Sequence, residues 1–175
     1  HTHSELVPFA RHTRPRSKLF QGVTTEIVGN CGISSFPLSD MFYQQICDFY
    51  YAMVPNSAEP IPLTDYNTEQ YAAHIRRSAP CINYGALIGH GTLRGSVMGF
   101  GMEPPTKGQL HQMEEVLDRE LSMGAFGMSL GLIYPPSSFS HQEELVALAK
   151  VLRRHDAILA VHMRNEGPRV FQAAD

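Results

Sequence analysis

Four short apolar segments, separated by helix-like segments, constrain the fold of this chain more than any other feature. They span residues 24–28, 82–88, 125–130 and 157–161, and each is followed directly by glycine or histidine. Each segment has the length and bulk of a single buried strand. Strands that alternate with helices form parallel sheets, because a parallel connection needs a long crossover. The fold class is therefore α/β, and the pattern alone leaves both a barrel and an open doubly wound sheet possible.

Helix signals lie between the predicted strands. Thr106 and Gln109 have the spacing of a capping box, and apolar residues follow at helical spacing. Ser140 and Glu143 predict a second capping box in front of another apolar face. A further helix is expected to begin near Asn67 or Thr68.

Composition excludes several classes of protein. The 175 residues are 43% apolar and 18% charged, which suits one folded domain rather than a disordered chain. A net charge of −3 without a basic cluster argues against nucleic acid and against an anionic membrane surface as partners. No apolar run reaches the ~18 residues that a membrane span needs. Three cysteines are too few for a disulfide framework, so we expect a reducing, cytoplasmic location.

Nine histidines are the one unusual count, and they prompt a search for metal ligands. His1 and His3 stand at i and i+2, which in a strand places both imidazoles on one face. Cys31, His90 and His162 each follow a different predicted strand, and in a parallel barrel these strand ends meet on one face. A thiolate together with imidazoles favours zinc over calcium or magnesium. His90 has two equal interpretations, a contact to ligands or substrate and a hydrogen-bonded structural histidine.

Six segments occur in an order typical of one enzyme family: His1–Ser4, Gln21–Gly32, Ala86–Arg94, Met123–Ser129, Gly131–Pro136 and His162–Glu166. In these segments the chain resembles the N-acyl-D-amino-acid deacylases (D-aminoacylases) of the amidohydrolase superfamily. The resemblance covers almost the whole chain and is loosest over residues 35–80.

The resemblance implies a TIM-like (β/α)8 barrel with a metal site at its mouth. Residues 1–175 would form the N-terminal part of this barrel domain, about strands 1–5 with their helices. The remaining strands and the small β domain of the family would lie outside this sequence. A barrel of this type needs more residues than the 175 present here.

The resemblance also implies a ligand set for zinc. His1 and His3 would bind one metal position, Cys31 would bridge two, and His162 would hold the second with a histidine from the next strand. Many amidohydrolases bridge their metals with a carboxylated lysine on strand four. Residues 127–130 offer no lysine, which fits a branch bridged by cysteine, in which one tightly bound zinc suffices and a second is possible.

The function implied by the resemblance is zinc-dependent hydrolysis of the amide bond of N-acyl-D-amino acids, small-molecule substrates that yield a carboxylate and a free D-amino acid. Zinc lowers the pKa of its bound water to about 7 and polarises the carbonyl, and a carboxylate then moves the proton. In the family that carboxylate is an aspartate on strand eight, expected beyond Asp175. Ile133 and Tyr134 are expected to line the substrate pocket, with His90 as a further candidate.

Two other functions stay open on the sequence. A cyclic-amide hydrolase, similar to dihydroorotases and hydantoinases, would have the same kind of site, but those relatives usually carry the lysine on strand four. A non-catalytic interaction protein with the amidohydrolase fold typically lacks the His-x-His pair. His1 and His3 are present here and disfavour that interpretation.

Overall fold

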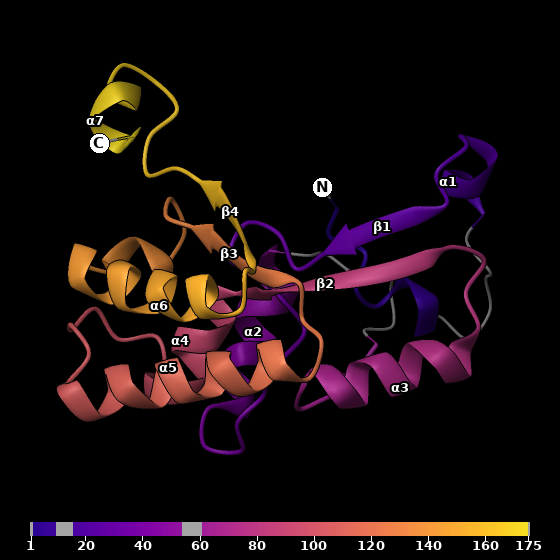
Figure 1. Cartoon of the computed structure of the whole chain (residues 1–175), viewed down its shortest axis with the longest axis horizontal. Coiled ribbons are helices and arrows are strands. Elements are labelled where there is room, and N and C mark those ends of the chain that lie inside the picture. Colours follow the sequence, from indigo (N-terminus) through magenta and orange to yellow (C-terminus); the bar gives the residue numbers. More distant parts are fainter. Residues whose placement is uncertain (1, 10–15, 54–60, 175) are drawn as a thin grey trace.

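The structure is a computed structural model that describes residues 2–9, 16–53 and 61–174. Four parallel strands form one sheet in the order β1-β2-β3-β4 (Figure 1). The strands are β1 (Thr25–Val28), β2 (Asn83–Gly89), β3 (Gly127–Gly131) and β4 (Ile158–His162). All four predicted strands are confirmed, each within two residues of its expected bounds.

Helices connect the strands and cover the sheet. They are α1 (Ser17–Phe20), α2 (Tyr43–Met53), α3 (Thr68–Ser78), α4 (His90–Met98), α5 (Lys107–Ser122), α6 (Gln142–Arg154) and α7 (Val170–Ala174), with 3₁₀ turns η1 (Val7–Phe9) and η2 (Ser137–Phe139). The helix expected near residue 67 is α3. Figure 1 shows α3, α5 and α6 on the same side of the sheet. None of the helices described in the structure is both long and apolar enough to cross a membrane.

One of the two predicted capping boxes is confirmed. At the start of α5, the Gln109 amide donates to Thr106 Oγ1 at 3.2 Å and the Thr106 amide donates to Gln109 Oε1 at 2.9 Å. The capping box at the start of α6 is wrong, because the N-cap there is His141 and makes no side-chain cap bond. The Ser140 hydroxyl donates instead to the carbonyl of Ser137 at 2.6 Å, which removes it from the helix end.

The sequence did not predict α4, which follows β2 without a loop. This helix contains Gly91 and Gly95 and is buried on almost every side, so it has neither the propensity nor the polar face that mark a helix in a sequence. A Cβ at Gly91 would stand 2.9 Å from the carbonyl oxygen of Gly32, and one at Gly95 would stand 2.7 Å from the Phe100 ring. Close packing explains why glycines occupy these positions.

The main core lies between the sheet and helices α4, α5 and α6. Its fully or almost fully buried members include Ile88, Leu93, Leu117, Met128 and Leu148. A second apolar cluster surrounds α2 and the loop that follows β1. The sheet is thus held rigidly from its helical side, which fixes the strand ends relative to one another.

A buried polar network joins α4 to α6. Glu144 Oε1 lies 2.8 Å from His90 Nε2 and 3.3 Å from Arg94 Nε, and all three side chains are almost completely buried. Burial by itself would raise the pKa of Glu144. The hydrogen bond from His90 and the charges of His90 and Arg94 lower this pKa by more than burial raises it. The net pKa of this carboxyl is below its ordinary value of 4.5.

We expect Glu144→Gln to lower the free energy of unfolding by about 3–5 kcal/mol at pH 7, because it leaves Arg94 buried without its counter-charge. The wild-type carboxylate stabilises the fold fully above its unfolded pKa of 4.5, and this contribution is lost as the pH falls through its lower folded pKa. The variant should lack this acid-dependent component. Urea unfolding at pH 7 and across the acid range measures both effects, with the exposed neighbour Glu143→Gln as control. Equal stability of the two variants would contradict the prediction.

Candidate metal centre

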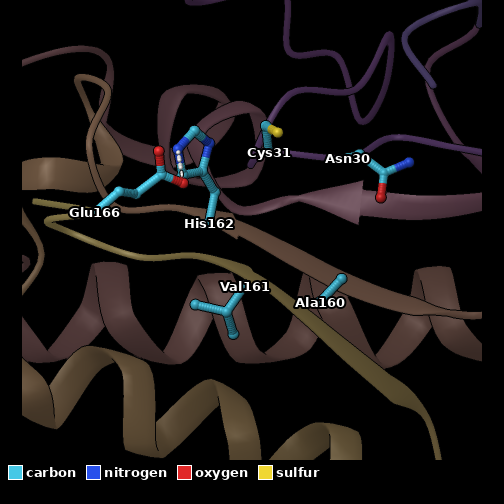
Figure 2. A pocket seen from close by; sticks show the side chains of 6 residues that line it. All are labelled: Asn30, Cys31, Ala160, Val161, His162 and Glu166. Atoms are coloured by element: carbon cyan, nitrogen blue, oxygen red, sulfur yellow. Dashed lines mark ion pairs between the residues drawn. The ribbon is translucent and has the colours of Figure 1, made fainter. Parts of the chain in front are cut away.

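A cavity of about 360 Å³ lies at the carboxyl ends of β1 and β4. Its lining residues are Asn30, Cys31, Ala160, Val161, His162 and Glu166. Figure 2 shows His162 between Glu166 and Cys31. Ala160 and Val161 of β4 also line the cavity. Because the strands are parallel, side chains from two distant parts of the sequence meet at this one edge of the sheet.

His162 is the last residue of β4 and pairs in register with Gly131 of β3. Its Nε2 lies 3.1 Å from Glu166 Oε1. Its ring and the ring of Tyr134 pack in a T-shaped arrangement, at a centroid distance of 5.2 Å and an interplanar angle of 85°. These two contacts orient the imidazole, as partners behind metal-binding histidines commonly do.

Cys31 lies in the turn that follows β1 and has a left-handed backbone with φ of 54°. Burial raises the pKa of its thiol, and the nearby carboxylate of Glu166 raises it further. A bound cation would oppose both effects, since it stabilises the thiolate. Metal binding at Cys31 would therefore displace a proton.

His3 is electrostatically coupled to His162. Burial lowers the pKa of His3, and the positive charge of His162 contributes to the same shift. A lowered pKa favours the neutral imidazole, which is the form that binds metals.

The segment that carries His3 is held by side chains rather than by strand pairing. Thr2 to Ser4 form no strand in the structure, and His1 lies outside the described residues. Lys18 Nζ donates to Thr2 Oγ1 at 2.8 Å and to Ser4 Oγ at 2.7 Å. These hydroxyls flank His3, so Lys18 fixes the segment on both sides of it.

The described donors suit zinc in their chemistry. Cys31 and His162 line one cavity, and thiolate and imidazole are the ligands that zinc prefers. Within residues 2–9, 16–53 and 61–174, no three His, Cys, Asp or Glu side chains are already grouped closely enough to hold a metal ion. The full ligand set of His1, His3, Cys31 and His162 thus stays a prediction.

The structure does not bring His90 to this cavity. Its side chain is fully buried, with Nδ1 2.9 Å from Ser137 Oγ and Nε2 2.8 Å from Glu144 Oε1. Both ring nitrogens are therefore used within the protein. His90 therefore has the arrangement of a hydrogen-bonded structural histidine, which is one of the two interpretations that the sequence left open.

Ile133 and Tyr134 follow β3 but do not line the 360 Å³ cavity. Ile133 is 44% exposed, and the Tyr134 ring contacts His162, which lines the cavity. Leu132 is buried in the main core. The role of Ile133 and Tyr134 in substrate binding stays a prediction.

Sequence reasoning missed two buried side chains that hold this edge of the sheet. Glu5 Oε1 accepts the amide proton of Gly29 at 2.6 Å, and Glu5 Oε2 accepts from the Tyr50 hydroxyl at 3.1 Å. Ser129 Oγ accepts from the Gly32 amide at 2.9 Å. The only sequence signal for Ser129 is that it is a polar residue within the apolar run of β3. No local pattern marks Glu5.

The chain matches no protein-family model. It is 31% identical to a D-aminoacylase of Alcaligenes xylosoxydans xylosoxydans, in an alignment that covers 100% of this chain and 34% of the relative. An N-acyl-D-aspartate deacylase and an N-acyl-D-glutamate deacylase of the same organism are each 33% identical, with the same coverage of 100% and 34%. The chain thus spans about a third of the length of these relatives.

Solved structures give the same result for the fold. An N-acyl-D-glutamate deacylase from Bordetella bronchiseptica, complexed with zinc and a phosphonate mimic of the tetrahedral intermediate, matches with a TM-score of 0.79 and 29% identity over 97% of this chain and 34% of that one. A D-aminoacylase with a binuclear metal centre matches with a TM-score of 0.83 and 30% identity over 99% and 35%. The parallel sheet with its helices therefore matches a part of the TIM barrel of D-aminoacylase amidohydrolases, which confirms the predicted fold class.

We expect the intact protein to bind zinc and Cys31→Ala to lose most of it. Removing a group that hydrogen-bonds to a metal ligand weakens metal binding by roughly 10- to 100-fold. Removing the thiolate ligand itself should weaken zinc binding by more than that. Elemental analysis after dialysis measures the zinc content. Cys81→Ala changes an exposed cysteine and should keep its zinc. Full zinc content in Cys31→Ala would show that Cys31 is not a ligand.

Proposed function

We propose that this chain, whose homologues are N-acyl-D-amino-acid deacylases, is part of a zinc hydrolase that cleaves the amide bond of N-acyl-D-amino acids. The products would be a carboxylate and a free D-amino acid. One observation carries the proposal: Cys31 and His162 line one cavity at the strand ends, in a fold that matches a deacylase complexed with zinc.

Cys31 and His162 would hold the tightly bound zinc, and His1 and His3 would complete a second position next to it. Bound zinc would supply a water of lowered pKa and would polarise the substrate carbonyl. The residues around these ligands would hold the sulfur and nitrogen donors in fixed directions towards the metal. A site that is loose by about 1 Å loses much of its activity.

Three contacts give this chain's donors their directions. The Glu166 carboxylate lies 3.1 Å from His162 Nε2 and sets the orientation of the ring. Asn30 Nδ2 donates to the carbonyl of Ile27 at 2.9 Å and to that of Thr2 at 3.3 Å. Asn30 thereby fastens the segment before His3 to the end of β1.

The apolar side of the cavity would exclude bulk water from the reacting amide. Ala160 and Val161 form this wall, and exclusion of water strengthens electrostatic interactions inside a site. The edge strand β4 exposes three large apolar side chains, Ile158, Leu159 and Val161. In our proposal further barrel strands cover this edge, and one of them carries the aspartate that moves the proton to the leaving nitrogen.

We also propose a cytoplasmic location for the protein. The sparse, odd set of three cysteines supports it, because secreted domains of this size tend to use paired cysteines. A metal-binding thiolate at Cys31 would likewise benefit from a reducing environment.

The proposed activity is tested with the intact protein on N-acetyl-D-amino acids, their L enantiomers, dihydroorotate and hydantoin. We expect hydrolysis of the D substrates, its loss after removal of metal by a chelator, and its return when zinc is added. Turnover of only the cyclic amides, or activity that survives complete removal of metal, would contradict the proposal.

The side chain of Ile133 should influence which substrate is preferred. If Ile133 lines the pocket, Ile133→Ala enlarges it and shifts preference towards bulkier apolar substrates by roughly 10- to 200-fold, the range that small changes in a hydrophobic pocket produce. The measurement is kcat/KM for N-acetyl-D-amino acids of increasing side-chain size, with zinc content checked. Val146→Ala on α6, where the exposed fraction is also 44%, is the control. An unchanged ranking would place the determinants of specificity elsewhere.

A further inference from the structure

The turn that joins β1 to the following loop has an unusual backbone. Gly29, Cys31 and Gly32 all have positive φ angles, of 78°, 54° and 72°. Cysteine in this region is unfavourable, because its Cβ crowds the backbone. Such a conformation persists only where the surrounding structure holds it in place.

This turn lies directly on the ends of β2 and β3. A Cβ at Gly131 of β3 would stand 1.9 Å from the carbonyl oxygen of Cys31, and a Cβ at Gly89 of β2 would stand 2.7 Å from the carbonyl carbon of Gly32. β1 and β3 are not neighbours in the sheet. The turn therefore crosses over the end of β2 to reach β3.

One side chain of β3 binds both ends of the turn. Ser129 Oγ donates to the carbonyl of Gly29 at 2.5 Å and accepts from the amide of Gly32 at 2.9 Å. Ser129 is fully buried, so neither backbone group can turn to water instead. A single hydroxyl has the donor and the acceptor that this bridge needs.

We propose that Ser129 is a positioning residue for the metal-binding thiolate, because it bridges Gly29 and Gly32 and so holds Cys31 at the cavity that His162 lines. The inference rests on the proposed zinc site and concerns how that site is built. Without the hydroxyl, two buried backbone groups lose their partner and the left-handed conformation of Cys31 loses its support. The thiolate then no longer has one fixed direction.

The test compares Ser129→Ala, Ser129→Thr and Ser96→Ala in the intact protein. Ser96 is a matched control, because it is also buried and its hydroxyl donates to a backbone carbonyl, that of Leu93 at 2.8 Å. Zinc affinity is measured by competition with a coloured chelator. Cobalt substitution reports the thiolate directly through its sulfur-to-cobalt absorption band.

We expect Ser129→Ala to weaken zinc binding by about 10- to 100-fold and to diminish the cobalt–thiolate band. Ser129→Thr retains the hydroxyl and should restore most of both signals, whereas Ser96→Ala should match the wild type. Wild-type affinity and an unchanged band in Ser129→Ala would overturn the inference. If the wild type itself shows no thiolate band, the proposed zinc site fails instead.

A second readout needs no metal. Alkylation rates of the cysteines in the metal-free protein, measured by peptide mass spectrometry, should rise several-fold for Cys31 in Ser129→Ala. The rates of exposed Cys81 and buried Cys47 should not change. An unchanged rate at Cys31, or equal increases at Cys31 and Cys47 that reveal general unfolding, would overturn the inference.

Discussion

The candidate site depends on close packing between the backbone of the 29–32 turn and the ends of β2 and β3. A Cβ at Gly29 would stand 2.0 Å from the carbonyl oxygen of Leu87, and a Cβ at Gly131 would stand 1.9 Å from that of Cys31. Neither contact leaves room for a side chain. The position of Cys31 is consequently fixed by backbone and by buried hydrogen bonds, which are far stiffer than an exposed loop. The cavity is then completed by His162 at the end of β4.

The loops around the cavity are tied to each other by polar contacts. Arg164, two residues after His162, donates to the carbonyls of Ser138 and Ser140 at 2.8 Å and 2.6 Å, which joins the segment after β4 to the loop after β3. The Ser137 hydroxyl in the same loop meets His90 of the buried network. Arg164 and His90, polar residues that follow strands in the sequence, thus hold the loops next to the cavity in place.

The sequence predicts the strands and the order of the site residues because both are local. An apolar run followed by glycine or histidine marks each strand, His162 follows its run directly, and Cys31 comes three residues after its own. Other features depend on partners far along the chain. The partner that holds His90 in the core is Glu144, which lies 54 residues further along the chain. Ser129 and Gly29, which are hydrogen-bonded to each other, are 100 residues apart. No periodic pattern encodes such pairs, so the sequence alone showed neither that His90 is structural nor that Ser129 supports the turn that carries Cys31.

The most direct test of the account is a crystal structure of the intact protein with anomalous diffraction at the zinc edge. Zinc bound by Cys31 and His162 should give an anomalous peak about 2.3 Å from Cys31 Sγ and about 2.0–2.1 Å from a ring nitrogen of His162. A zinc peak that is bonded to neither residue, in crystals whose protein carries stoichiometric zinc, would contradict it.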